Sequence, residues 1–83
     1  MKKSYTIITS FGTQQWRNKW DQLHRDGDLP ALTFTDGSKS WYINGIRHRD
    51  NNLPACMWNN GDQSWWKNGV CYRWDKWILG YDE

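Results

Sequence analysis

Short stretches of alternating apolar and polar residues follow one another along the chain, and Asp-Gly or Asn-Gly dipeptides separate them. This alternation has the period of a β-strand. Asp-Gly and Asn-Gly favour type I′ turns, because both central residues of such a turn need a positive φ. The dipeptides are Asp36-Gly37, Asn44-Gly45, Asn60-Gly61 and Asn68-Gly69. The pattern therefore predicts an all-β fold, an antiparallel meander of hairpins.

Strands are expected between these turns, with two weaker candidates near the N-terminus. The predicted strands cover residues 31–35, 38–43, 46–50, 54–59, 62–67 and 70–74, and the weaker ones cover residues 5–9 and 13–18. Pro54 cannot donate to a central ladder. The chain from Ile46 to Trp58 is therefore expected to be one long strand with a bend at residues 50–54. Residues 74–79 are left as a short closing turn of helix or as a last strand.

An internal repeat organises the chain. Leu29-Pro30-Ala31 returns 24 residues later as Leu53-Pro54-Ala55, and His24-Arg25-Asp26 returns as His48-Arg49-Asp50. The first and last copies are irregular, as terminal copies of a repeat often are. The sequence thus predicts one domain of three tandem units of about 24 residues. The domain is expected to cover residues 1–83, with units at about 11–35, 36–59 and 60–83.

The most specific parts of these copies are W-Y-I-N-G at 41–45, W-W-K-N-G at 65–69 and two H-R-D-x-x-L-P-A segments. Hairpins of this kind resemble the tandem MORN-like repeats of short proteins from phages and large DNA viruses, over about residues 11–73. The resemblance implies a repeated sheet used for binding, in a protein of viral type. MORN repeats proper carry Gly at the positions of Arg25, Arg49 and Arg73.

Counting outward from two-residue turns sorts the side chains onto two faces. The count places Trp65 opposite Cys56 and Tyr72, and Trp41 opposite Leu32. It also places Tyr42 opposite Arg47 and Trp66 opposite Cys71. Cys56 and Cys71 are placed on opposite faces, so two free thiols are expected. The predicted core face carries Leu32, Phe34, Trp41, Ile43, Ile46, His48, Cys56, Trp58, Trp65, Val70, Tyr72 and Trp74. The predicted second face carries Ala31, Thr33, Ser40, Tyr42, Arg47, Arg49, Ala55, Met57, Ser64, Trp66, Cys71 and Arg73.

The second face is expected to be aromatic and cationic together, and it holds the candidate binding residues. Guanidinium groups beside exposed rings stack on planar ligands and pair with phosphates. The same arrangement is a common cover for a solvent-facing ring, and a second copy of the chain is another possible occupant. The candidate ligand-binding or partner-binding residues are Tyr42, Arg47, Arg49, Trp66 and Arg73.

Composition predicts a small soluble domain with an aromatic core. Aromatic residues make up 17% of the 83 positions, and eight of them are Trp. The apolar runs, such as Trp77 to Leu79, are far too short for a membrane helix. No apolar segment of signal-peptide length follows the basic N-terminus, so a cytoplasmic protein is expected. A net charge of +2 does not by itself predict a nucleic-acid binder.

The two His-Arg-Asp triplets invite a catalytic interpretation, with His24 or His48 as base and Asp26 or Asp50 orienting it. No nucleophile accompanies them, and an active site needs no second copy of its parts. We therefore expect a structural role for the triplets and no enzyme activity. The two cysteines form no C-x-x-C pair and the chain has no phosphate-binding loop, so neither a metal nor a cofactor is expected.

The sequence as a whole predicts a non-enzymatic binding or inhibitory protein that acts by stoichiometric occupation of a partner. A host protein, such as a component of a defence system, is the favoured partner, because Trp, Tyr and Arg concentrate binding energy at interfaces. A nucleotide or single-stranded nucleic acid is the alternative, and a carbohydrate is a third. A homodimer is also expected, because eight Trp exceed what one thin sheet can hide.

Overall fold

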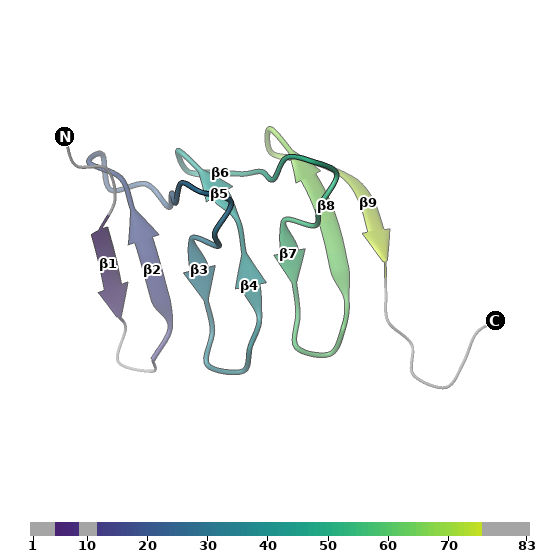
Figure 1. The fold of residues 1–83 in the computed structure, drawn as a ribbon, viewed down its shortest axis with the longest axis horizontal. Helices are drawn as coiled ribbons and strands as arrows, with labels where there is room; N and C mark the ends of the chain where they lie inside the picture. The colour runs from purple at the N-terminus through teal and green to yellow at the C-terminus, as the bar shows by residue number, and fades with distance from the viewer. Residues whose placement is uncertain (1–4, 9–11, 76–83) are drawn as a thin grey trace.

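The computed structural model describes residues 5–8 and 12–75, which form an all-β, antiparallel structure without a helix. Seven strands form one sheet in the order β1-β2-β3-β4-β7-β8-β9, and β5 and β6 form a two-stranded hairpin (Figure 1). The strands are β1 (Tyr5–Ile8), β2 (Gln14–Arg17), β3 (Leu32–Thr33), β4 (Lys39–Ser40), β5 (Tyr42–Ile43), β6 (Ile46–Arg47), β7 (Cys56–Met57), β8 (Gln63–Lys67) and β9 (Val70–Asp75). The predicted fold class is therefore confirmed at this level.

The long strand predicted from Ile46 to Trp58 is interrupted where a bend was expected. β6 ends at Arg47 in the two-stranded sheet, and the next strand, β7, belongs to the seven-stranded sheet, so the prediction of one long strand over these residues is wrong. Asn51 and Asn52 in between have φ angles of 65° and 58°, a left-handed conformation that Asn tolerates better than most residues. Of the closing segment 74–79, Trp74 and Asp75 belong to β9 and the remainder lies outside the described residues.

Two of the four predicted turns have the predicted type. At Asn44-Gly45 the φ angles are 50° and 82°, and at Asn68-Gly69 they are 53° and 83°. Positive φ at both central positions is what a type I′ turn requires. The two-residue loops confirm two predicted cross-strand pairs, Tyr42 with Arg47 and Trp66 with Cys71.

The other two turns contain one residue more than predicted. At Asp36-Gly37 and Asn60-Gly61 only the glycine has a positive φ, 96° and 98° respectively. The Phe34 N–H donates to the Ser38 carbonyl oxygen at 2.9 Å, which closes a loop of three residues. Residues 59–61 form the same kind of loop one hairpin later. A three-residue loop that ends in a left-handed glycine is the next most common hairpin connection after the two-residue turn.

The extra loop residue shifts the register by one, so the predicted faces are wrong for many residues, although Trp41, Cys56 and Trp65 are buried as predicted. Cys56 lies opposite Ser64 instead of Trp65, and Leu32 lies opposite Ser40 instead of Trp41. A one-residue slip turns every side chain of a strand to the other face. The predicted core residues Phe34, Ile46, Trp58, Val70, Tyr72 and Trp74 are exposed, and the predicted outer residues Ala31, Ser40, Ala55 and Ser64 are buried. A bulge at Tyr72 in β9 also places Trp65 opposite Arg73 instead of Tyr72.

Trp41 and Trp65 are the large side chains of the buried core, each only 6% exposed. Their indole N–H groups donate to backbone oxygens in the loops that precede them. Trp41 Nε1 lies 3.1 Å from the Asp28 oxygen, and Trp65 Nε1 lies 3.0 Å from the Asn52 oxygen. A buried indole needs such a partner, and each bond ties a loop to the sheet.

Arginine side chains cover the outer side of these rings. The guanidinium carbon of Arg49 lies 3.8 Å from the centroid of the Trp41 ring, and that of Arg73 lies 4.4 Å from the Trp65 ring. Arg25 covers Trp16 at 3.8 Å in the same way. Long side chains that lie flat on a ring remove apolar surface from water while their charge stays near solvent. The rings are therefore hidden without a second layer of structure.

Both cysteines are free thiols, with Cys56 buried and Cys71 exposed. The reason differs from the predicted one, because their partners in β8, Ser64 and Trp66, are two residues apart and share a face. Cys56 and Cys71 are instead kept apart by β8 itself, at two strand spacings of about 4.8 Å. A disulfide needs a much closer approach.

Within the described ranges, no helix is long and apolar enough to cross a lipid bilayer.

The turn at Asp36 makes part of the stability dependent on pH. Asp36 Oδ1 accepts a hydrogen bond from the Ser38 N–H at 2.8 Å, and this bond lowers the pKa of Asp36 below its ordinary value. A lowered folded-state pKa means that the bond stabilises the fold above the unfolded-state pKa and is lost as the pH falls through the folded-state value. We expect the Tm of the unmodified protein to fall more than that of Asp36→Asn when the pH is lowered from about 6 to about 3.

The second loop provides the matched control. Asn60 Oδ1 accepts from the Asp62 N–H at 2.9 Å, the same bond with a side chain that does not titrate. Asn60→Asp should therefore increase the acid-dependent loss of Tm. Identical Tm profiles for all three proteins, measured by circular dichroism, would contradict this assignment.

Candidate functional site

A row of small side chains crosses the middle of one face of the sheet. Cross-strand pairing runs from Leu32 through Ser40, Cys56 and Ser64 to Trp74, and residues directly opposite each other share a face. Ser40, Cys56 and Ser64 are buried, and Ser40 Oγ lies 3.2 Å from Cys56 Sγ. Since these side chains are short, rings from neighbouring positions cover the middle of the row.

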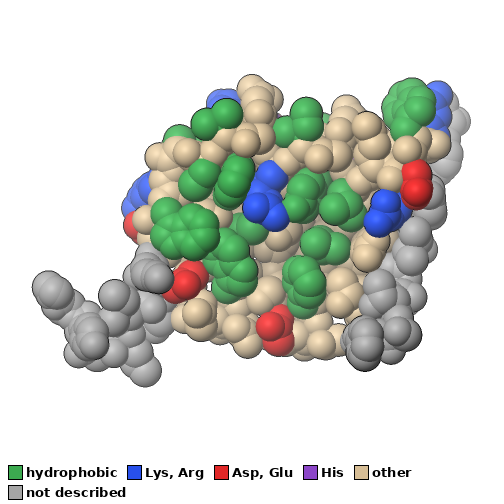
Figure 2. Space-filling view, turned by 180° about the vertical axis from the view of Figure 1, so that it is seen from behind, with side chains coloured by type: hydrophobic (Ala, Val, Ile, Leu, Met, Phe, Trp, Pro, Cys, Tyr) green, Lys and Arg blue, Asp and Glu red, His purple; other side chains and the backbone are tan. Residues whose placement is uncertain are grey.

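We call this surface the aromatic face, and it is formed by Phe34, Tyr42, Arg47, Trp58, Trp66 and Trp74. The rings of Trp58 and Trp74 contact each other, with centroids 5.0 Å apart and planes tilted by 35°. These two residues are 36% and 50% exposed. Figure 2 shows hydrophobic side chains over most of this face, with a basic side chain in their midst and acidic ones at the lower margin. An exposed apolar surface of this kind marks an interaction site on a soluble protein.

Arg47 lies between two rings of the aromatic face. Its guanidinium carbon is 5.1 Å from the centroid of the Tyr42 ring and 4.9 Å from that of Trp66. One of its terminal nitrogens, Nη2, donates to the Tyr42 hydroxyl, whereas Nε is buried without a hydrogen-bond partner. The ion pairs of the described residues include other arginines but not Arg47. Arg47 thus presents a positive charge in apolar surroundings.

The structure brings together three of the five binding residues predicted from the sequence, Tyr42, Arg47 and Trp66. Their two-residue turns had the predicted geometry, so their cross-strand pairs formed as expected. The other two, Arg49 and Arg73, lie on the opposite face of the sheet, over Trp41 and Trp65.

Arg49 and Arg73 are also paired with carboxylates. Arg49 Nε lies 2.9 Å from an oxygen of Asp28, and Arg73 Nη2 lies 2.9 Å from an oxygen of Asp75. Arg49 Nη1 donates in addition to the Pro54 carbonyl oxygen. Their guanidinium groups are therefore engaged by the protein itself, which leaves Arg47 as the member of the predicted set without a carboxylate.

Sequence reasoning missed three residues of the aromatic face, Phe34, Trp58 and Trp74, because it placed them in the core. For Phe34 and Trp58, the sequence is also compatible with the correct placement. Thr35-Asp36-Gly37 and Asn59-Asn60-Gly61 each fit a three-residue loop with glycine last. Counting from loops of that length puts residues 34 and 58 on the same face as Tyr42 and Trp66.

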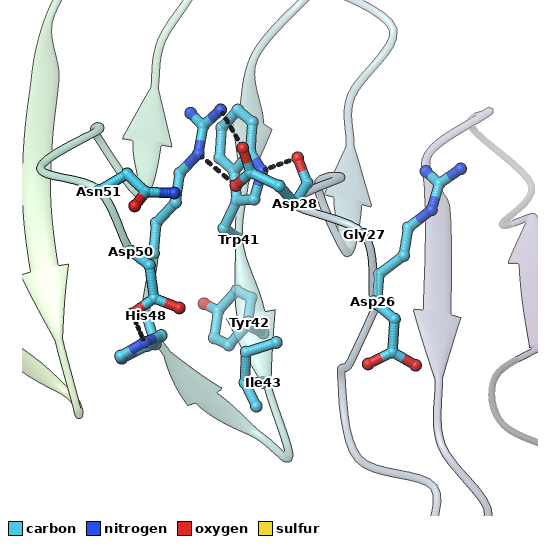
Figure 3. Close-up of a pocket in the computed structure, with 11 residues that line it drawn as sticks. Asp26, Gly27, Asp28, Trp41, Tyr42, Ile43, His48, Asp50 and Asn51 are labelled. Carbon is cyan, nitrogen blue, oxygen red and sulfur yellow. Dashed lines mark hydrogen bonds and ion pairs between the residues drawn. The ribbon is translucent and has the colours of Figure 1, made fainter.

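A cleft of about 190 Å³ lies between residues 25–28 and residues 48–51 (Figure 3). Tyr42 and Arg49 both line it, so these two predicted residues share a cavity although their side chains make different contacts. Besides Arg49, the charged groups of the lining are Arg25, Asp26, Asp28 and Asp50, and His48 also lines the cleft. Cations and carboxylates alternate there, so the cleft favours no ligand of one charge. Among the described residues, no group of three His, Cys, Asp or Glu side chains is placed to hold a metal ion.

The histidines of the two triplets connect neighbouring hairpins. His48 Nδ1 accepts from the Asn68 N–H at 2.9 Å, and its Nε2 lies 2.8 Å from Asp50 Oδ1. Since Nδ1 accepts, we assign the proton to Nε2, which donates to Asp50. His24 makes the same two contacts, with the Asn44 N–H at 2.9 Å and with Asp26 at 3.1 Å. Both ring nitrogens are thus occupied by local contacts, which favours the structural role over the catalytic one.

No protein-family model matches this chain, and comparisons with curated proteins and with solved structures find no similar protein. Function is therefore inferred from the chain's own side chains and their contacts.

Replacing His48 tests the structural role of the triplets. His48→Ala removes the acceptor of the exposed Asn68 N–H, so we expect the free energy of unfolding to fall by about 0.5–1.5 kcal/mol, the net contribution of one hydrogen bond. In a domain of this size, Tm should fall by roughly 4–8 °C for each kcal/mol. Thermal unfolding followed by circular dichroism measures this change.

Asp50→Asn is the matched control, because an amide oxygen can still accept from His48 Nε2. It should change the free energy of unfolding much less than His48→Ala does. An unchanged Tm for His48→Ala would show that the histidine does not hold the hairpins together.

Proposed function

We propose that this chain is a non-enzymatic binding protein that acts by occupying a partner protein with its aromatic face. The observation that carries this proposal is the exposure of Phe34, Trp58 and Trp74 on the face that also presents Arg47. Trp41 and Trp65 are buried and stabilise the sheet. The rings of Phe34, Trp58 and Trp74 remain exposed to water, so stability of the fold does not explain them. Trp, Tyr and Arg are the residues that contribute most to binding energy at protein interfaces.

We further propose that the chain is a tandem-repeat protein of MORN-like type with units of about 24 residues. Contacts that recur at that spacing support this architecture. Arg49 covers Trp41 as Arg73 covers Trp65, and the indole of each Trp donates to a loop oxygen 13 residues earlier. His24 and His48 accept from Asn44 and Asn68 in the same way. Under the resemblance to viral proteins, the partner is a host protein in the cytoplasm, such as a defence component.

A nucleotide or single-stranded nucleic acid is the second candidate, and Arg47 between Tyr42 and Trp66 is the observation that favours it. A guanidinium next to rings can pair with a phosphate while a base stacks nearby. The carboxylates paired with Arg49 and Arg73 weigh against it, since they neutralise two of the cations that such a site would use. We therefore rank it below a protein partner.

Removing two rings tests the proposed function. We expect Trp58→Ser combined with Trp74→Ser to weaken binding of the partner at least about 30-fold, because a single central aromatic residue that contributes about 2 kcal/mol is enough for that loss. The partner is first captured from a host extract with the full chain and identified. Its affinity for each variant is then measured with purified proteins, and native mass measurement tests the expected stoichiometric complex.

Trp20→Ser is the matched control, because Trp20 is 66% exposed but lies in the loop after β2, outside the aromatic face. It should change the affinity no more than about threefold. Equal losses for Trp20→Ser and the double variant would reject the aromatic face as the binding surface. Capture of no protein, together with quenching of Trp fluorescence by nucleotides, would replace a protein partner with the second candidate.

A further inference from the structure

We propose that the aromatic face receives a protein surface that presents a carboxylate among apolar side chains, and that Arg47 pairs with this carboxylate. This inference rests on the proposed function and adds the chemistry of the partner. Its site is the centre of the aromatic face, where Arg47 lies between Tyr42 and Trp66.

The surroundings of Arg47 already exclude much of its water. Its Nε is buried without a hydrogen-bond partner, and rings lie on both sides of the guanidinium group. A partner that covers the surrounding rings would remove the remaining water from this charge. Burying a charge is costly unless an opposite charge or hydrogen-bond acceptors replace the water. A partner that docks here must therefore supply an acceptor for Arg47.

The geometry of the guanidinium group favours a carboxylate as that acceptor. The contact between Nη2 and the Tyr42 hydroxyl orients the group, and the Tyr42 and Trp66 rings, with centroids 5.1 and 4.9 Å from the guanidinium carbon, restrict its movement. A planar guanidinium with a restricted orientation is suited to a carboxylate, which can accept two parallel hydrogen bonds. The chain uses this pairing at Arg49, whose Nε and Nη2 lie 2.9 and 3.4 Å from the two carboxylate oxygens of Asp28, and single contacts pair carboxylates with Arg17 and Arg73. Among these described ion pairs, none satisfies Arg47.

A second copy of the chain fits the face less well. Most homo-oligomers are symmetric, and a two-fold interface uses the same patch on both subunits. Such an interface would bury two Arg47 side chains. The acidic side chains visible on this face lie towards its edges, at the lower margin and at the two sides, away from the basic group in the middle (Figure 2). Charge complementarity therefore favours a different protein with an acidic group at the centre of its contact surface.

A nucleic acid also fits less well. Binding to a phosphate backbone uses several cations along a groove. Arg49 and Arg73 lie on the opposite face of the sheet and are paired with Asp28 and Asp75. One guanidinium within an apolar surface instead suits one carboxylate within an apolar surface.

Selection from a random displayed peptide library on the immobilised full chain tests the inference. We expect the unmodified protein to enrich peptides with Asp or Glu flanked by apolar or aromatic residues. Arg47→Gln should lose the preference for acidic residues, and Arg47→Glu should enrich Lys and Arg in their place. Arg25→Gln is the matched control, because Arg25 stacks on Trp16 on the opposite face and should leave the enriched peptides unchanged.

One enriched peptide is then synthesised with its acid and with the corresponding amide. We expect the acid to bind the unmodified protein roughly ten times more tightly or better, and we expect this difference to vanish in Arg47→Gln, as a pairwise contact requires. Arg47→Lys keeps the charge without the planar group and should retain a preference for the acid with weaker binding. Circular dichroism of each variant confirms that it is folded.

Several results would overturn the inference. Enriched peptides without acids, or an acid preference that persists in Arg47→Gln, would show that Arg47 does not select a carboxylate. Tight binding of oligothymidylate that is lost in Arg47→Gln would assign the site to a nucleic acid, and a dimer strengthened by Arg47→Gln would assign it to a second copy. In the peptide experiment, the proposed function fails if every enriched peptide binds the Trp58→Ser, Trp74→Ser variant as tightly as it binds the unmodified protein. Enrichment of apolar peptides without acids that still need Trp58 and Trp74 for binding would contradict the carboxylate inference without contradicting the proposed function.

Discussion

The described part of the sheet is a single layer, and this constraint determines how every large ring is used. With no second layer to cover them, Trp41 and Trp65 are hidden by their own chain. Arg49 and Arg73 lie flat on the two rings, and the indole N–H groups are satisfied by loop oxygens. One face is thereby closed by stacked side chains. The other face has small buried residues at its centre and exposed rings over them, which is why it is the surface available to a partner.

The sequence predicted the fold class and half of the turns correctly, and the register of the remaining hairpins failed for a definable reason. Asp-Gly and Asn-Gly occur in two-residue loops and in three-residue loops, because both need a residue with positive φ near the end of the turn. At Asn44 the asparagine itself has a positive φ, and at Asp36 it is only the following glycine. Local sequence does not separate these cases, and one residue of difference exchanges the two faces of a strand.

The candidate site was predictable to the same extent. Tyr42, Arg47 and Trp66 were found because their two turns are of the simple type. Arg49 was grouped with them because the pattern places its charge near the rings, but its partner Asp28 lies 21 residues earlier in the chain. Such pairs depend on how the loops fold over the sheet, and alternation along a strand contains no information about them. The same arrangement leaves Arg47 without a carboxylate and so separates the structural arginines from the one available for binding.

The most direct test of this account is the oxidation of individual tryptophans in the free protein, mapped by hydroxyl-radical footprinting and mass spectrometry. If the aromatic face is open and the opposite face is closed by arginine stacks, Trp58 and Trp74 react at rates similar to that of Trp20, and Trp41 and Trp65 are strongly protected. Protection of Trp58 and Trp74 in the free chain, or rapid oxidation of Trp41 and Trp65, would contradict it.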